Sequence, residues 1–80
     1  MNVKLLGRKV VGVKQTTKII KSGSARIVYI ARDADIKVTK PIEDLCRQNN
    51  IELIIIDTMK DLGHICGIDV GAATAALVNE

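Results

Sequence analysis

Three lysines are spaced so that a helix would present them together. Lys14, Lys18 and Lys21 stand at i, i+4 and i+7, which places three ammonium groups on one face of a helix. Like charges at this spacing repel one another, and the segment from Val13 to Ser22 contains no acidic residue to relieve them. The segment therefore suits an external anion, although an ordinary solvated face is the alternative that the sequence leaves open.

The residues around the first lysine fit the same chemistry. Gly12 precedes the expected helix, lets a foreign backbone approach closely, and leaves the amides of the helix start free for phosphate. Gln15 both donates and accepts hydrogen bonds, so it can read a base edge as well as a phosphate. The segment from Gly12 to Lys21 is therefore predicted to bind a nucleic acid or a phosphorylated ligand.

The chain contains one aromatic residue, which limits how it can read a nucleic acid. Proteins that read single strands stack bases on exposed aromatic side chains, whereas Tyr29 lies inside the apolar run Ile27 to Ala31. Readout should instead depend on RNA shape, on phosphates and on a few hydrogen bonds. A helix in a DNA groove is the competing picture, but no second helix precedes this one at helix-turn-helix spacing.

The cysteines and the histidine are not spaced for a metal or for catalysis. His64 and Cys66 are two residues apart on an expected helix, so their side chains point apart, and Cys46 is distant in the sequence. We expect both cysteines to be buried, reduced thiols and His64 to lie at the surface. The chain is therefore expected to hold no metal.

Four aspartates occur near the expected strand ends, where catalytic groups of α/β enzymes usually lie. One of them has a structural explanation, because Thr58 and Asp61 resemble a helix capping box. The glycines form neither a dinucleotide-binding nor a phosphate-loop pattern, and no nucleophile has a recognisable base. We expect neither enzymatic activity nor a cofactor. The four aspartates are Asp33, Asp35, Asp57 and Asp61.

The segments that must position these side chains alternate between helix and strand. Apolar β-branched runs predict strands, and apolar residues at helical spacing between turn signals predict helices. The pattern predicts an α/β fold, a three-layer α-β-α sandwich with a mixed four-stranded sheet. Expected helices cover Val13–Ser22, Thr39–Gln48 and Thr58–Gly67; expected strands cover Ile27–Ala31, Ile51–Ile56 and Thr74–Val78; and Lys4–Val11 is expected to be a frayed helix followed by a short strand.

The composition indicates one globular domain with an uneven charge. Eighty residues, 48% of them hydrophobic, suffice for a single core, so residues 1–80 are taken as one domain. Residues 1–26 carry seven bases and no acid, a net +7, whereas residues 27–80 carry a net −4. This asymmetry indicates an anionic partner for the first third of the chain. Because no apolar run has signal-peptide or membrane-spanning length, we expect a cytoplasmic monomer without membrane contact.

Four segments resemble one protein family. The stretch from Gly12 to Lys18 is similar to the G-x-[NK]-[EQ]-x-[TV]-K signature of the kink-turn-binding ribosomal proteins of the L7Ae type. One such motif would be weak, but three further segments match in the same order, and together they cover almost the whole chain. The further segments are Ile30–Asp35, Leu62–Gly67 and Ile68–Ala73.

The resemblance implies a protein that binds a sharply bent RNA element with tandem sheared G·A pairs. Gly12 would allow close approach of the RNA, Lys14 and Gln15 would contact the guanines or their phosphates, and Lys18 would anchor a guanine or phosphate. The loop from Ile68 to Ala72 would cover the unpaired bulge. The RNA-contacting residues expected on this basis are Gly12, Val13, Lys14, Gln15, Lys18, Lys21, Arg32, Ile68, Asp69, Val70, Gly71 and Ala72.

Two positions depart from archaeal and eukaryotic members and resemble the compact bacterial branch. Lys14 stands where those members usually have asparagine, and Gly71 replaces a common loop proline. A lysine lacks the two-way hydrogen bonding of an amide, which changes how the G·A pairs can be read. Arg32 would lie at the edge of the site, and the family's first helix is expected to be truncated.

Two functions from different classes stay open. In the first, the protein binds kink-turn RNA, such as ribosomal RNA or a riboswitch, with or without a stable place in a ribonucleoprotein. In the second, it is a protein-interaction or assembly factor whose apolar loop 68–71 docks on a partner through Ile68 and Val70. That loop could equally pack beside the core.

Overall fold

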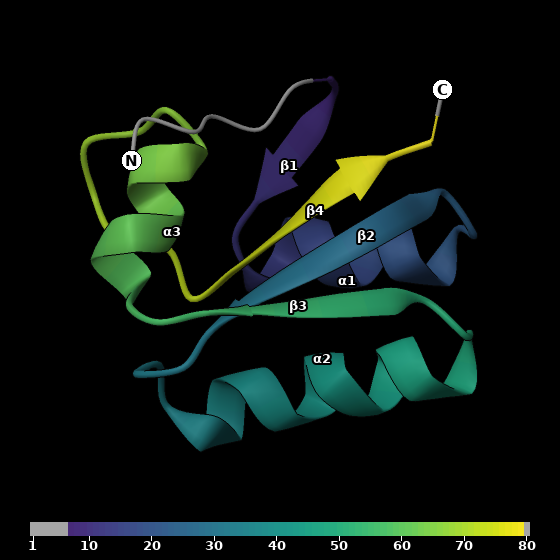
Figure 1. Ribbon diagram of the computed structural model, residues 1–80. Helices are drawn as coiled ribbons and strands as arrows, with labels where there is room; N and C mark the ends of the chain where they lie inside the picture. Colours follow the sequence, from purple (N-terminus) through teal and green to yellow (C-terminus); the bar gives the residue numbers. More distant parts are fainter. Residues whose placement is uncertain (1–6, 80) are drawn as a thin grey trace.

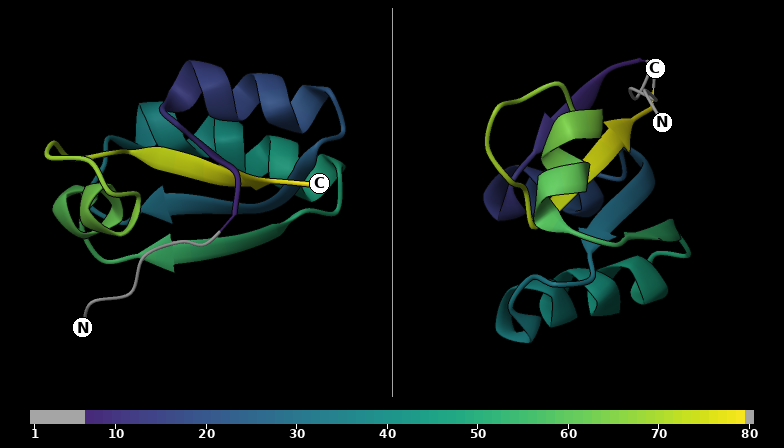
Figure 2. Two further views of the ribbon diagram at one scale, coloured as in Figure 1. Left: turned by 90° about the horizontal axis from the view of Figure 1, so that it is seen from above. Right: turned by 60° about the vertical axis from the view of Figure 1, so that its left-hand side comes forward.

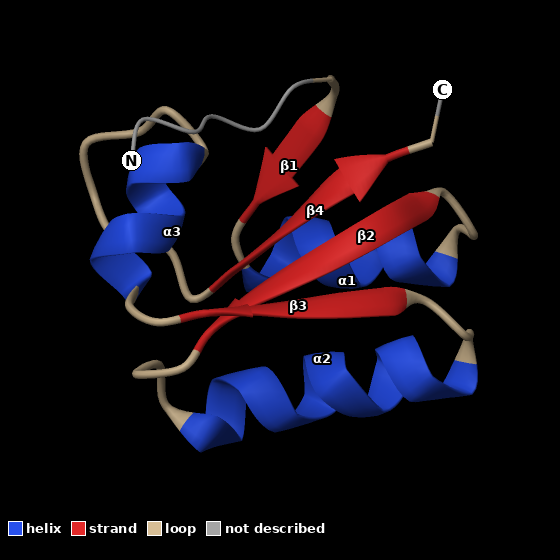
Figure 3. Ribbon diagram, in the orientation of Figure 1, coloured by secondary structure: helices blue, strands red, loops and turns tan. Residues whose placement is uncertain are grey.

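Helices and strands alternate in the computed structural model, which describes residues 7–79 (Figures 1 and 3). The strands are β1 (Lys9–Val11), β2 (Ala25–Ala31), β3 (Glu52–Ile56) and β4 (Thr74–Val78). The helices are α1 (Val13–Lys21), α2 (Ile36–Gln48) and α3 (Met59–Ile65). None of the helices in this described part combines the length and the apolar character needed to cross a bilayer.

The four strands form one mixed sheet in the order β1-β4-β2-β3. Strand β4 is antiparallel to both β1 and β2, whereas β2 and β3 are parallel. The first three strands therefore run in one direction, and their carboxyl ends lie together (Figure 1). Because each of them leads into a helix, α1, α2 and α3 all begin at this carboxyl end of the sheet.

The sheet separates two apolar clusters, and β2 supplies alternate residues to both. Val28 and Ile30 pack with residues of α1 and α2, whereas Tyr29 and Ala31 pack with Leu62 of α3. Figure 2 shows α1 and α2 on one face of the sheet and α3 on the other. The predicted three-layer sandwich with a mixed four-stranded sheet is confirmed.

Helix α2 begins earlier than the sequence pattern predicted. It starts at Ile36, because Asp35 caps it by accepting a hydrogen bond from the Lys37 amide at 2.9 Å. The predicted start, Thr39, lies in the second turn and is buried. Proline is common in the first turn of helices, but Pro41 lies inside this one. The side-chain cap therefore sets the start of α2. The helix continues through Pro41, although proline has no amide hydrogen to donate within the helix.

Of the other boundaries, those of β4 agree with the prediction, and several differ from it by one or two residues. Strand β2 begins at Ala25 rather than Ile27, and β3 at Glu52 rather than Ile51. Helix α1 ends at Lys21 and α3 at Ile65. Within the segment Lys4–Val11, the last three residues form β1, Gly7 and Arg8 are not helical, and residues 4–6 lie outside the described part.

One polar group of α1 is buried without a partner. The Thr16 side chain is fully buried, and its hydroxyl has no hydrogen-bond partner among residues 7–79. Such a hydroxyl costs about 1–3 kcal/mol, and valine has nearly the same shape without it. We expect Thr16→Val to stabilise the fold by about 1 kcal/mol and to raise the melting temperature by roughly 4–8 °C. Thermal unfolding tests this, with the half-buried neighbour Thr17→Val as control; an unchanged or lower melting temperature would contradict it.

Candidate functional site

The register of the sheet brings three predicted site segments into one row. The Gly12 amide donates to the Thr74 carbonyl at 2.9 Å, and the Ala31 amide donates to the Ala73 carbonyl at 2.9 Å. On the other side of β2, the Arg32 amide donates to the Ile56 carbonyl at 2.7 Å. The start of α1, the end of the loop before β4 and Arg32 therefore lie side by side at the carboxyl end of the sheet.

The positive ends of three helix dipoles converge here, and two of them are already satisfied by acceptors of the protein itself. Asp35 caps α2. At the start of α3, the Thr58 hydroxyl accepts from the Asp61 amide at 2.9 Å, and the Asp33 carboxylate accepts from the Met59 amide at 2.7 Å. Helix α1 differs, because its N-cap is Gly12 and no side chain caps it. The start of α1 is thus the place where an external anion finds donors.

Gly12 has a backbone conformation that residues with a side chain rarely adopt. Its φ is 104° and its ψ is 159°, and a Cβ added there would meet no atom within 4 Å. Its own amide is bonded to the Thr74 carbonyl, so it is not one of the open donors. The open donors are those of Val13 to Gln15, whose amides have no acceptor among the described residues.

The lysine stripe of α1 faces outward, as predicted. Lys14, Lys18 and Lys21 are exposed, as is Gln15, whereas Ile20 points into the core. None of the three lysines forms an ion pair within residues 7–79. The stripe runs the length of α1, so Lys14 lies at the carboxyl end of the sheet, Lys18 one turn further, and Lys21 about 10 Å from Lys14 along the axis.

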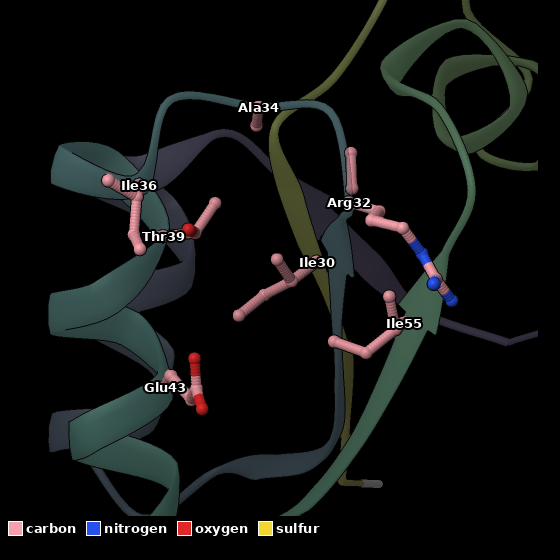
Figure 4. A pocket seen from close by; sticks show the side chains of 8 residues that line it. Ile30, Arg32, Ala34, Ile36, Thr39, Glu43 and Ile55 are labelled. Carbon is pink, nitrogen blue, oxygen red and sulfur yellow. The ribbon is translucent and has the colours of Figure 1, made fainter.

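Arg32 borders the site but is held loosely. Its guanidinium lies 3.7 Å from the Asp57 carboxylate, and both side chains are largely exposed, so the pair stabilises little. Figure 4 shows Arg32 directed toward β3 and away from a depression of about 400 Å³ between α2 and the sheet. The depression is walled mainly by aliphatic side chains such as Ile36 and Ile55, and its carboxylate, Glu43, is paired with Arg47 at 2.7 Å.

The loop between α3 and β4 lies directly on α3. The Ile68 amide donates to the Gly63 carbonyl and the Ala72 amide to the Met59 carbonyl, both at 3.0 Å. A Cβ on Gly63 would stand 2.0 Å from the Val70 carbonyl oxygen, so only glycine permits this approach. The loop is therefore fixed in position by contacts on its inner side.

The side chains of this loop are not equally available. Val70 is 69% exposed, and Asp69 and Gly71 are also exposed. Ile68 is half-buried against the core cluster beneath α3, and Ala72 is 5% exposed, so its side chain belongs to the core. Of the two apolar side chains expected to contact a ligand from this loop, Val70 is the more exposed and Ile68 is half-buried.

The remaining reactive side chains are placed as the sequence predicted. Cys46 and Cys66 are free and buried, and burial raises the pKa of both thiols. His64 is exposed, and no group of side chains suited to a metal ion occurs in the part of the chain described. Tyr29 is buried, and its burial, with the nearby Glu52 charge, raises the pKa of the phenol. It therefore offers no stacking platform for a base.

Two exposed apolar residues of this end were missed by sequence reasoning. Ile36 is 71% exposed and Met59 is 37% exposed, and each is the first residue of its helix. Together with Val13 and Val70 they give the carboxyl end a mixed apolar and basic surface. The capping residues Asp35 and Thr58 were the available signal, because they mark the residues at which α2 and α3 begin.

The family of the chain follows from comparison with known proteins. A model of the ribosomal protein L7Ae/L30e/S12e/Gadd45 family matches residues 3–80. The chain belongs to this family. The resemblance expected from the four sequence segments is thereby confirmed. The matched residues include α1, Arg32 and the loop before β4.

Relatives within the L7Ae/L30e/S12e/Gadd45 family include bacterial and archaeal proteins. An RNA-binding protein of Caldanaerobacter subterraneus subsp. tengcongensis is 52% identical over 69 residues, covering 86% of this chain and 84% of that protein. Large ribosomal subunit protein eL8 of Halobacterium salinarum is 35% identical over 68 residues, covering 84% of this chain and 57% of that protein. The solved structure of a Giardia lamblia 15.5kD RNA binding protein gives a TM-score of 0.84 at 25% identity, over 90% of this chain and 61% of that chain.

Proposed function

We propose that the protein binds structured RNA and recognises kink-turns through the carboxyl end of its sheet. The observation that carries this proposal is the uncapped start of α1, where open amides and the lysine stripe stand in one row with Arg32 and the loop before β4. Its relatives include proteins named as RNA-binding. No catalytic step is part of this function.

The roles of the residues follow from their positions. Gly12 keeps the helix start free of side-chain bulk, so an RNA backbone can reach the amides of residues 13–15. Lys14 and Gln15 are exposed in the first turn and would contact the sheared G·A pairs or their phosphates. Lys18, one turn further, would anchor a guanine or phosphate of the same stem.

The apolar part of this surface suits unpaired nucleotides. Val70 projects from the loop, and Val13 and Met59 are partly exposed at the same end. Bases in a bulge are unstacked and expose apolar faces, which aliphatic side chains can cover even where no aromatic is available. We assign Val70 and the backbone of Gly71 and Ala72 to the bulge of the kink.

Titration against two RNAs of equal length tests the proposal. One carries a kink-turn, and in the other the sheared G·A pairs are replaced by Watson–Crick pairs. A preference of at least tenfold for the kinked RNA, about 1.4 kcal/mol, is expected at moderate salt. Equal affinity for both RNAs would leave only general attraction to a polyanion and would contradict recognition of the kink.

A second function is favoured by the exposure of Val70 on a loop that is held rigidly. An assembly factor could dock loop 68–71 on a partner protein through this side chain. Salt separates the two functions: RNA binding through several phosphates should weaken by orders of magnitude between 50 and 200 mM salt, whereas an apolar interface should barely respond. If loop 68–71 docks on a partner protein, Val70→Ser should abolish that docking; if the protein binds a kink-turn, the same change should remove only the contact with the bulge and leave the salt dependence of RNA binding unchanged.

The setting of the proposed function is the cytoplasm, where the two free, buried thiols would stay reduced. Ribosomal RNA and riboswitches are both candidate targets. Similarity to a ribosomal subunit protein motivates the first, although the chain spans 57% of that relative. Co-sedimentation of the protein with ribosomal subunits at high salt would separate a stable ribosomal component from one that binds other RNAs.

A further inference from the structure

Within residues 7–26, exposed bases occur at both ends of the sheet. Lys14 stands at the carboxyl end of the sheet, but Lys21 is in the last turn of α1. Arg8 immediately precedes β1, and Arg26 is the second residue of β2. Figure 1 shows the starts of β1 and β2 and the end of α1 at the amino end of the sheet, opposite the candidate site.

The strand register brings the two arginines near each other. The Arg8 carbonyl accepts a hydrogen bond from the Val78 amide at 2.9 Å, and Val78 pairs with Ala25 on its other side. Arg8 and Ala25 therefore flank the last residue of β4, roughly 10 Å apart at two strand spacings. Arg26 follows Ala25 directly, and Lys21 stands at the other end of the short turn that leads into β2.

These bases are exposed at the end of the sheet where α1 finishes. Val10 belongs to the cluster beneath α1 and α2, so Arg8, two residues earlier, lies on the same side of the sheet as α1. Arg8, Lys21 and Arg26 are exposed, and none forms an ion pair within residues 7–79. Lys21 thus continues the lysine stripe to the end of the sheet at which Arg8 and Arg26 lie.

The acidic residues, unlike these bases, lie mainly at the carboxyl end of the sheet. Most carboxylates outside α2 follow strands or begin helices at the carboxyl end, where several act as caps. At the amino end, Glu52 begins β3 and forms no ion pair with the described residues, and Glu80 lies outside them. The excess positive charge is therefore greatest at the end that the kink-turn site does not use.

We propose that Arg8 and Arg26, with Lys21, contact the phosphates of an A-form stem that leaves the kink along α1. The inference rests on the proposed function and extends it to the far end of the sheet. Helix α1 spans about 13 Å, so a stem that meets Lys14 and Lys18 needs little further length to reach this end. Asn79 also lies at this end, where its backbone amide donates to the Ser24 carbonyl at 2.7 Å. Three positive charges dominate the surface, so the contact is mainly with phosphates and depends little on sequence.

Two RNAs with the same kink-turn test this contact. In one, the stem beside α1 ends level with Lys18; in the other, it is longer by about one helical turn. Two added phosphate contacts should steepen the plot of log affinity against log salt by about 1.4–1.8, and should raise affinity about tenfold at low salt. The double variant Arg8→Ala, Arg26→Ala should bind both RNAs with the affinity of the short one.

The matched control removes the same charge elsewhere. Lys40 and Arg47 lie on α2 in ion pairs with Asp44 and Glu43, and the double variant Lys40→Ala, Arg47→Ala should leave the difference between the two RNAs intact. Should the arginine double variant not fold, Arg26→Ala alone should reduce the salt slope for the long RNA by about half as much.

Two results would overturn the proposal while leaving kink recognition standing. One is equal affinity and equal salt slope of the wild-type protein for the two stems. The other is an equal loss on both RNAs in the arginine double variant, which would mean diffuse attraction. Loss of all preference for the kink would instead contradict the proposed function, so the two failures are distinguishable.

Discussion

Replacing Gly63 by alanine should destabilise the domain by about 3 kcal/mol and lower its melting temperature by more than roughly 10 °C. In an isolated helix the same change would stabilise by about 1 kcal/mol, because glycine is a poor helix former. Here the added Cβ would stand 2.0 Å from the Val70 carbonyl oxygen and 3.0 Å from its carbon. The Val70 backbone cannot move aside as the end of a flexible side chain can. The steric cost of the added Cβ therefore exceeds the gain in helix propensity.

A substitution with open space around it controls for this effect. A Cβ at Gly23 would meet nothing within 4 Å, although its φ of 76° strains a residue with a side chain. Gly23→Ala should therefore cost only about 1 kcal/mol. Thermal melts of the two variants decide the matter, and a Gly63→Ala protein that melts at or above the wild-type temperature would show that the loop does not rest on α3.

Replacing Lys18 by alanine should weaken binding to kink-turn RNA by at least tenfold. A hydrogen bond from an ammonium to a guanine or phosphate contributes about 1.5–3 kcal/mol, and Lys18 has no ion-pair partner among residues 7–79 to share it with. The side chain is exposed on a helix whose fold depends on Thr16 and Ile20. Binding should therefore fall without a change in stability.

Lys40→Ala provides the comparison for Lys18→Ala at the same change in net charge. Lys40 is an exposed helix residue on α2, paired with Asp44 at 3.0 Å, and such pairs contribute little to stability. We expect its loss to change RNA affinity less than twofold in a fluorescence titration. Equal losses from the two variants would mean that the RNA responds to net charge and not to the lysine stripe.

Local signals explain what the sequence predicted well. Helix α1 was located to within one residue, because Gly12 and Gly23 bracket it and its lysines repeat at helical spacing. Strand β2 was predicted from the run Ile27–Ala31, which is apolar on both faces, as suits the central place that the strand has in the sheet. The exposed stripe of the site follows directly from these two elements.

Contacts between distant segments explain what was missed. Asp33 was read as a polar exit from a strand, but it caps a helix that begins 26 residues later. Gly63 carried no signal of its own, because its role depends on where the Val70 backbone lies. Ala72 was assigned to a ligand-binding loop. Its amide, however, donates to the Met59 carbonyl, and its side chain is buried in the core.

The position of β4 in the sheet has a consequence for synthesis on the ribosome. It is the last described strand along the chain, yet it lies between β1 and β2 and supplies the carbonyls that bond Gly12 and Ala31. While the chain emerges, β1 has no partner strand, and the start of α1 lacks the neighbour that fixes Gly12. Such long-range pairing slows folding. The nascent chain should therefore acquire affinity for its ligand in a single late step, once β4 has left the exit tunnel.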